Sequence, residues 1–389
     1  MVMRFNPLLR WLFLAVWIFL CMAFSAWGGD DLLLMPAKKS SKAPVSLLMD
    51  VTKANGRLVA VGERGHILVS KDNGESWTQS DVPVSVTLTA VSFPSSQKGW
   101  VVGHDGVVLH SEDCGESWKK QLDGWKINEL MLVQLKQIIK IKTEELENAE
   151  QAVDEEKAEA LKQKLEELNF FLNDANLAVE EGPTRPLMDV WFKNDREGLV
   201  IGSFGMILKT TDGGDSWEPI LDRIDNSDGL HYYAITRSGD DLFIAGEAGM
   251  LFISNDFGQN WKRLNSPYEG SFFGIIGSPD GGLVTAFGLR GRIFCSHDRG
   301  ENWLPAENGN SASLSGGIFL SDGSFLVAGI DGFLMWSIDK GKTFMRLPTE
   351  FSGIISLTET SDGKLVLVGM RGTTKVDAYK LSSKNEGKS

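Results

Sequence analysis

Residues 202–217 read GSFGMILKTTDGGDSW, and this stretch decides the fold. Its first half is a Gly-x-x-Gly pair followed by a short apolar run. Its second half has the form Ser/Thr-x-Asp-x-Gly-x-x-Trp and begins at Thr210. Glycines that join two apolar runs are typical of a turn between two β-strands. The stretch therefore predicts a pair of strands followed by a second, aspartate-containing turn.

The Gly-x-x-Gly pair occurs seven times. Its copies begin at Gly62, Gly103, Gly202, Gly246, Gly288, Gly329 and Gly369. Successive copies lie 41, 99, 44, 42, 41 and 40 residues apart. A period near 40 residues is typical of a β-propeller, in which each repeat is one four-stranded blade. The sequence therefore predicts an all-β, seven-bladed β-propeller with an insertion in the long gap.

The aspartate-containing pattern follows six of the seven pairs. Its aspartates are Asp72, Asp113, Asp212, Asp256, Asp298 and Asp339. Such an aspartate can accept hydrogen bonds from the backbone amides of a tight turn, while the glycine supplies a positive φ. The aromatic residue that ends the pattern can pack between neighbouring sheets. These Asp boxes, which resemble those of sialidases and of unrelated propellers, are therefore assigned a structural role.

The segment from Trp125 to Glu181 has a different character. It contains no Gly or Pro, seven lysines and fourteen acidic residues, and its leucines recur at the spacing of a coiled coil. One straight helix would carry the chain roughly 75 Å away, whereas blade 3 must begin beside blade 2. We therefore expect a two-helix hairpin that bends between Ala149 and Glu159. It is a candidate contact device, with a purely structural insertion as the alternative.

The N-terminal 28 residues are predicted to be a signal peptide. Arg4 and Arg10 precede an apolar run over 11–22, and small residues follow over 23–28. The run is shorter than the roughly 20 residues that span a bilayer, so we expect cleavage, with an uncleaved anchor as the alternative. Lipidation of Cys21 is disfavoured because the bulky Leu20 precedes it. These features predict a periplasmic protein that associates with the membrane through a partner.

The predicted domain organisation follows from these boundaries. The signal peptide covers 1–28, blades 1 and 2 cover 29–125, the hairpin covers 126–182, and blades 3 to 7 cover 183–389. Ring closure needs the last blade to borrow a strand from the other terminus, and Asp31 to Met35 is the candidate segment.

Charge and motif content exclude several classes of ligand. The 389-residue chain has a net charge of -13, and such a surface would repel nucleic acid and anionic lipid. The five histidines show no spacing typical of metal ligands. We therefore predict no nucleic-acid partner, no metal, no cofactor and no small-molecule substrate.

The Gly-x-x-Gly turns combined with Asp boxes resemble the photosystem II stability and assembly factor family of chloroplasts and cyanobacteria. Residues 187–192, LMDVWF, and 202–214 carry the resemblance best, and it extends over all seven blades. It implies a non-enzymatic scaffold that assists an integral membrane protein complex. Residues 181–183 and 267–273 are instead similar to a proteobacterial branch resembling accessory proteins of resistance-nodulation-division type exporters. A periplasmic exporter subunit is therefore an alternative function.

The photosystem II assembly factor family, which this sequence resembles, binds its client through a patch of arginines on the propeller. Here the residue before the second turn glycine is Arg64, Arg290 or Arg371 in three blades, with Arg292 nearby. Equivalent positions lie on one ring, so these side chains could converge on an acidic group of a partner. The alternative is that they are solvated or locally paired. The other four blades carry Asp105, Phe204, Ala248 and Asp331 at this position.

A sialidase-like glycoside hydrolase is the alternative from another class, because that fold also carries Asp boxes beside an arginine triad, a tyrosine nucleophile and acidic residues. Tyr232 and Tyr233 lie on a predicted strand of blade 4, where core packing explains them. Glu63 and Glu247 follow turn glycines and are interpreted as solvated. Sialidases moreover have six blades rather than seven. We therefore predict that the protein is not an enzyme and has no catalytic residues.

Overall fold

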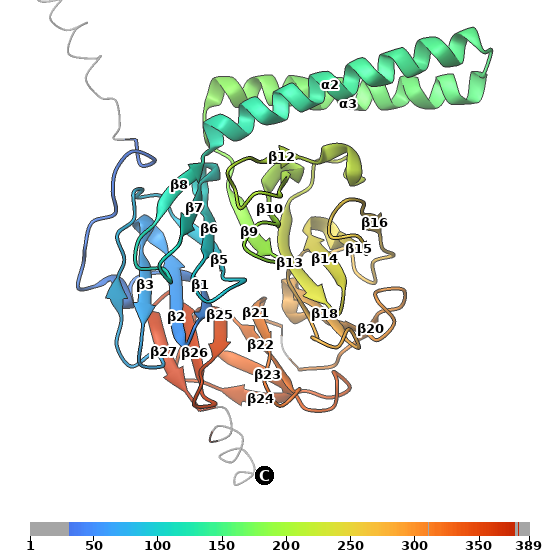
Figure 1. The fold of residues 1–389 in the computed structure, drawn as a ribbon. Coiled ribbons are helices and arrows are strands. Elements are labelled where there is room, and N and C mark those ends of the chain that lie inside the picture. The colour runs from blue at the N-terminus through green and yellow to red at the C-terminus, as the bar shows by residue number, and fades with distance from the viewer. Residues whose placement is uncertain (1–30, 310, 378–379, 381–389) are drawn as a thin grey trace, which may run out of the picture.

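The computed structural model describes residues 31–309, 311–377 and 380. They form seven antiparallel sheets arranged in a ring, from which a pair of long helices projects (Figure 1). The predicted fold, a seven-bladed β-propeller with an inserted helical hairpin, is confirmed. The predicted signal peptide lies outside the described residues. Within the described ranges, no helix is both long and apolar enough to cross a membrane.

Six blades have four strands and the seventh has three. Blades 1 to 3 consist of β1 (Leu48–Ala54), β2 (Arg57–Gly62), β3 (Ile67–Ser70), β4 (Thr78–Gln79), β5 (Leu88–Ser92), β6 (Gly99–Gly103), β7 (Val108–Ser111), β8 (Lys119–Leu122), β9 (Leu187–Phe192), β10 (Gly198–Gly202), β11 (Ile207–Thr210) and β12 (Glu218–Pro219). Blades 4 and 5 consist of β13 (Tyr232–Ser238), β14 (Asp241–Gly246), β15 (Leu251–Ser254), β16 (Lys262–Arg263), β17 (Phe272–Gly277), β18 (Val284–Gly288), β19 (Ile293–Ser296) and β20 (Leu304–Pro305). Blades 6 and 7 consist of β21 (Leu314–Phe319), β22 (Phe325–Gly329), β23 (Phe333–Ser337), β24 (Met345–Pro348), β25 (Ile354–Glu359), β26 (Leu365–Gly369) and β27 (Gly372–Val376).

The apolar core is divided among the interfaces between blades. The second strand of a blade, such as β6 or β10, is buried at every position, because each sheet is covered on both faces by its neighbours. Seven apolar clusters result, one between each pair of adjacent blades. A blade is therefore stable only when a neighbour covers each of its faces.

The Asp boxes make the hydrogen bonds expected of them. In blade 3, the Thr210 hydroxyl donates to Asp212 (2.8 Å) and accepts from the amide of Gly214 (2.9 Å). The amide and hydroxyl of Ser216 both donate to Asp212, at 2.9 and 2.6 Å, and these bonds lower the pKa of Asp212 to about 2. The other five boxes repeat this arrangement. The box tryptophan Trp217 packs into the cluster between blades 2 and 3.

The hairpin consists of α2 (Gly124–Gln151) and α3 (Glu155–Glu181), so the predicted bend between Ala149 and Glu159 is confirmed. Asp123 and Asp154 cap the two helices by accepting from backbone amides, each at 3.2 Å. The two arms pack through buried apolar side chains along their length. Each arm is about 40 Å long at 1.5 Å per residue.

The prediction of a ring-closing strand at Asp31 to Met35 is wrong. This segment forms a turn, and its Leu33 side chain is buried in the cluster between blades 1 and 2. The backbone oxygen of Leu32 accepts from the amide of Ser85, which lies between those blades. Its apolar residues are therefore used at the other side of blade 1, and β27 remains the last strand of blade 7.

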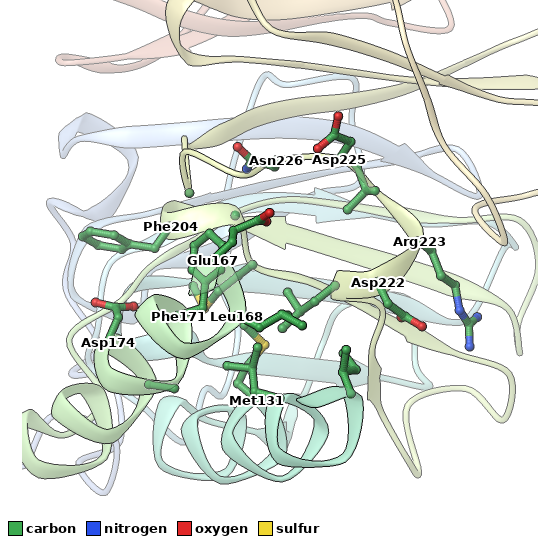
Figure 2. A pocket seen from close by; sticks show the side chains of 18 of the residues that line it. Met131, Glu167, Leu168, Phe171, Asp174, Phe204, Asp222, Arg223, Asp225 and Asn226 are labelled. Carbon is green, nitrogen blue, oxygen red and sulfur yellow. The ribbon is translucent and has the colours of Figure 1, made fainter. Parts of the chain in front are cut away.

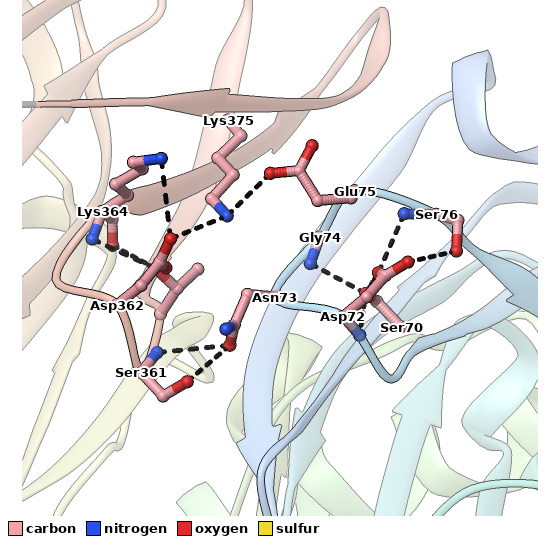
Figure 3. Close-up of polar contacts among 11 residues, drawn as sticks. Ser70, Asp72, Asn73, Gly74, Glu75, Ser76, Ser361, Asp362, Lys364 and Lys375 are labelled. Atoms are coloured by element: carbon pink, nitrogen blue, oxygen red, sulfur yellow. Dashed lines mark hydrogen bonds and ion pairs between the residues drawn. The ribbon is translucent and has the colours of Figure 1, made fainter.

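Blade 7 closes the ring through side chains. Val366 and Val368 pack into the cluster with the apolar residues of blade 1. Lys375 bridges Glu75 of the blade 1 Asp box (3.0 Å) and Asp362 of blade 7 (3.1 Å), as Figure 3 shows. The Ser361 hydroxyl donates to Asn73 of the same box at 2.7 Å. The turn of the blade 1 Asp box thus makes the polar contacts that join blade 7 to blade 1.

Two aspartates on the innermost strands tie neighbouring blades together. A bulge follows the first residue of β1 and of β9, and Asp50 and Asp189 come directly after it. Asp50 accepts from the Val91 amide of blade 2 (2.9 Å) and from the Ser356 hydroxyl of blade 7 (2.7 Å). Asp189 accepts from the Ile235 amide of blade 4 at 2.8 Å. Burial raises the pKa of both carboxyls, that of Asp189 to about 7.

Asp189 is expected to make the stability of the protein fall as the pH rises. Folding raises its pKa from 3.8 to about 7, so the folded state binds more protons between these values. The free energy of unfolding should therefore decrease with pH in that window, by at most about 1.4 kcal/mol per unit for one group. Asp189→Asn should flatten this dependence in denaturant titrations, leaving the contribution of Asp50, whose pKa is also raised.

Asp212→Asn, in the same blade, is the matched control. The pKa of Asp212 is lowered on folding, so its stabilisation is complete above about pH 5 and is lost only as the pH falls further. This variant should lower stability without changing the slope between about pH 5 and 7. An unchanged slope in Asp189→Asn would contradict the assignment.

Candidate functional site

All seven Gly-x-x-Gly turns lie on one face of the ring, which we call the turn face. Each turn joins the second and third strands of its blade, and the Asp boxes occupy the opposite end, which we call the box face. The connections from each blade to the next also lie on the turn face, because the fourth strand runs back to it. The hairpin is such a connection, between β8 and β9, and so leaves from the turn face.

The turns hold Arg64 and Arg290 in an unusual backbone conformation. In blades 1 to 5 the residue before the second glycine has a positive φ, which is 56° for Arg64 and 57° for Arg290. The next glycine in blade 1, Gly65, also has a positive φ, and a Cβ there would lie 2.1 Å from the backbone oxygen of Val84. In blade 7 the positive φ falls on Gly372 alone, so Arg371 sits in a different kind of turn from the other two.

The four predicted partner-binding arginines Arg64, Arg290, Arg292 and Arg371 are all exposed. Their side chains make neither a hydrogen bond nor an ion pair within the described residues, whereas those of six of the other eight described arginines do. Blades 7 and 1, which carry two of them, are neighbours, whereas blade 6 separates blade 5 from blade 7. The four therefore share a face, and their convergence on one group of a partner stays a prediction.

Asp331 interrupts this basic sector in blade 6. Its carboxylate lies 3.3 Å from the guanidinium of Arg346, which also covers the Phe333 ring at 3.4 Å. The position equivalent to Arg64 in this blade is thus engaged locally. This turn position therefore carries arginine in some blades and other residues, such as Asp331, in the rest, as the sequence predicts.

The hairpin is anchored to the propeller at its base. Asn128, buried at the start of α2, donates to the backbone oxygens of Ala178 (2.7 Å) and Gly182 (3.0 Å) at the end of α3. Further along α2, Gln134 donates to the backbone oxygen of Pro219 in blade 3 and accepts from the amide of Leu221. These polar contacts fix the register of the two arms and their direction across blade 3.

Arg185 joins the hairpin to the turn face. Its guanidinium makes a bidentate pair with Asp174 of α3, at 2.7 and 2.9 Å, and lies 4.6 Å from the centre of the Phe204 ring in the blade 3 turn. Only 12% of the Arg185 side chain is exposed. Sequence reasoning missed this residue, because its partners lie 11 and 19 positions away on two different elements.

The residues considered for catalysis do not gather into a site. Tyr232 is fully buried and packs against Phe252, with ring centres 6.1 Å apart. Glu63 accepts from the amide of Leu47, and Glu247 from that of His231. These contacts give all three residues structural roles. Across the described ranges, no group of three His, Cys, Asp or Glu residues could hold a metal ion.

Replacing Arg185 by alanine should loosen the hairpin. A partly buried bidentate pair and a ring contact are lost together, so we expect a cost of about 1–2 kcal/mol, measured as faster hydrogen exchange along 170–181. A double-mutant cycle with Asp174→Ala should give a coupling energy of about 1 kcal/mol. Lys126→Ala at the exposed Lys126–Glu129 pair is the control, with an effect below about 0.5 kcal/mol. Equal effects at the two sites would contradict the anchoring role.

Solved structures share the propeller. A structure described as YCF48 bound to D1 peptide aligns with a TM-score of 0.60 and 16% identity, covering 88% of this chain and 99% of that one. YCF48 from Cyanidioschyzon merolae aligns with a TM-score of 0.58, also at 16% identity, over 88% of this chain and 97% of that one. The WD40 propeller domain of Doa1 aligns with a TM-score of 0.58 at 11% identity, over 90% and 97%. At such identities these likenesses concern the fold alone.

Two curated relatives match a short part of the chain. The photosystem II assembly lipoprotein Ycf48 of Synechococcus sp. (strain CC9902) is 36% identical over 77 residues, which are 20% of this chain and 23% of that protein. The chloroplastic photosystem II stability/assembly factor HCF136 of Arabidopsis thaliana is 29% identical over 82 residues, 20% of each protein. The matched segment thus spans about a fifth of each relative.

The family match is much longer. The family model described as photosynthesis system II assembly factor YCF48 matches residues 39–135 and 172–373. Both matched ranges lie largely in the propeller, and the break between them falls within the arms of the hairpin. Because this match covers most of the chain, the protein belongs to the YCF48 family and is a photosystem II assembly factor-like β-propeller.

Proposed function

We propose that the protein is a non-enzymatic scaffold, acting in the periplasm, that holds a segment of an integral membrane protein complex during its assembly or operation. The observation that carries this proposal is the set of unpaired arginines on the turn face of an acidic protein. Export is supported by the basic and apolar pattern of residues 1–28. Membership of an assembly-factor family supports a role in holding a client rather than in catalysis.

The arginines form the first proposed contact surface. Arg64, Arg290, Arg292 and Arg371 are exposed on a chain whose net charge is -13, so an acidic client segment would be drawn to this part of the surface and repelled elsewhere. An exposed guanidinium without a local partner is free to make a bidentate pair with a carboxylate. A structure of one relative is described as bound to D1 peptide, which supports a peptide segment as the client here.

The hairpin forms the second proposed contact surface. Phe170 and Leu177 lie two turns apart on α3 and so share one side of the helix, with 69% and 55% of their surfaces exposed. Val133 of α2 is 64% exposed. Large apolar side chains on a projecting arm are typical of protein contact surfaces. The alternative functions, an exporter subunit and a sialidase-like hydrolase, are not favoured by the family match.

Capture of the client tests the arginine surface. Tagged protein is incubated with detergent-solubilised membranes, and bound proteins are identified by mass spectrometry. The triple variant Arg64→Ala, Arg290→Ala, Arg371→Ala should lose a specific membrane complex that the unmodified chain captures. The matched control removes the same charge from the box face, as Arg57→Ala, Arg196→Ala, Arg237→Ala, and should retain the complex. Absence of any specific complex, or equal loss in both triple variants, would overturn the proposal.

The same capture tests the hairpin. Phe170→Ser with Leu177→Ser should weaken capture severalfold, because apolar area is lost from the contact. Val153→Ser, at the exposed tip of the hairpin, is the control and should leave capture unchanged. Undiminished capture by the double variant would restrict the contact to the arginine surface.

A further inference from the structure

A pocket of about 400 Å³ lies between the base of the hairpin and blades 3 and 4. Figure 2 shows Met131, Leu168 and Phe171 of the hairpin on one side, and Asp225 and Asn226 of the β12–β13 connection on the other. Its volume falls within the range of about 300–1,000 Å³ that is common for small-molecule sites. The arginine surface does not border this space, whereas the anchoring residues Asn128, Asp174 and Arg185 form part of its wall.

Contacts between the hairpin and the propeller enclose the pocket on several sides. Gln134 is bonded to Pro219 and Leu221 at one edge, and Arg185 links Asp174 to Phe204 at another. The Phe171 ring approaches Gly229 so closely that a Cβ on this glycine would lie 3.2 Å from it. A site bounded in this way has the shape of a small-molecule pocket.

The cationic residues around the pocket have ion-pair partners, whereas two acidic residues there have none within the described ranges. Each of its four cationic residues has an acidic partner, in the pairs Lys142–Glu145, Lys164–Glu167, Arg185–Asp174 and Arg223–Glu218. Asp222 and Asp225 also line the pocket, and neither has an ion-pair partner among the described residues. The uncompensated charge at the rim is therefore negative, while the interior is mainly apolar.

Two buried polar groups in the pocket wall, on Tyr232 and Trp261, lack a hydrogen-bond partner within the described residues. Tyr232 is fully buried, and its hydroxyl makes no hydrogen bond within the described part of the chain, although Asn226 lies beside it. Trp261 of the wall also has an unpartnered Nε1, but the box tryptophans Trp77, Trp217 and Trp303 share that feature. Tyr232 is thus the distinctive group, since an unsatisfied buried hydroxyl in this wall is costly.

We propose that this pocket binds a lipophilic small molecule with an apolar body and a neutral or cationic polar end. The apolar body replaces water against Met131, Leu168 and Phe171, and the polar end lies toward Asp222 and Asp225. A hydroxyl or carbonyl on the ligand supplies the partner that Tyr232 lacks. The sequence predicted no small-molecule substrate, and this ligand is bound without being transformed. The inference does not rest on the proposed scaffold function.

The test uses N-phenyl-1-naphthylamine, a neutral apolar dye whose fluorescence rises in an apolar site. The unmodified protein should bind it at one saturable site, and Met131→Trp, which fills the pocket, should weaken binding at least about tenfold. Gln137→Trp places the same side chain on the exposed side of α2, away from the residues that line the pocket, and is the control, with unchanged binding. Circular dichroism melting confirms that both variants are folded.

The rim charges are tested with charged amphiphiles of equal chain length. Dodecyltrimethylammonium should displace the dye at concentrations at least severalfold lower than dodecyl sulfate, both below their micelle-forming concentrations. Asp222→Asn with Asp225→Asn should remove this preference and leave binding of the neutral dye unchanged. Equal displacement by both amphiphiles would overturn the predicted ligand class.

If Met131→Trp fails to fold, Leu221→Trp fills the pocket from the propeller side and carries the same expectation. Absence of saturable dye binding by the unmodified chain would overturn the proposal, as would equal binding by the filling variants and Gln137→Trp. A further outcome is that the unmodified protein binds no dye while a folded filling variant loses capture of the client. This outcome would assign the pocket to a side chain of the client and would overturn the small-molecule site.

Discussion

The contact between blade 7 and blade 1 is the constraint on which the rest of the ring depends. Every apolar cluster of the ring has one wall from each of two blades, so an open ring would expose the faces that carry Leu58 and Val366. Among the residues that the structure describes, no strand is exchanged across this junction. Instead, Asn73 and Glu75 of the first Asp box reach Ser361 and Lys375 of the last blade. A motif that stabilises its own turn elsewhere in the ring here also joins the two ends of the chain.

Much of this architecture is predictable because it is periodic. The glycine turns and Asp boxes indicate backbone geometry that each blade needs separately, and the helical spacing of leucines without Gly or Pro predicts the hairpin.

The failures of prediction concern contacts between distant parts of the chain. Residues 31–35 have the composition of a strand, but Leu33 is buried as part of a turn. Asp50 and Asp189 each follow Leu-Met and precede Val, and this shared tetrapeptide was the available signal for their bridging role. Arg371 shares the glycine spacing of Arg64 but not its backbone conformation, which the spacing alone does not reveal.

The turn face is divided electrostatically. Blades 5, 7 and 1 present the unpaired arginines, whereas the hairpin, which leaves between blades 2 and 3, carries seven lysines against fourteen acidic residues over 125–181. Charges of opposite sign at opposite sides of one face would orient an approaching partner as well as attract it. Because exposed charges are screened within about 8 Å at physiological ionic strength, this orientation depends on salt more strongly than the packed core does.

The contacts that hold the hairpin to the propeller lie at its base, whereas residues beyond them set its length. Asn128, Gln134 and Arg185 act at its base, where Gly124 and Pro183 approach so closely that a Cβ on Gly124 would lie 2.7 Å from the proline. The cluster near the tip, which includes Leu146, Ala149 and Leu161, is made of hairpin residues only. Whole helical turns could therefore be added to or removed from both arms in register without changing the short connection between the hairpin and the ring. The family match stops at 135 and resumes at 172, so it includes the base and omits the distal part. The insertion of this chain therefore acts as a spacer, whose length sets how far the tip lies from the propeller.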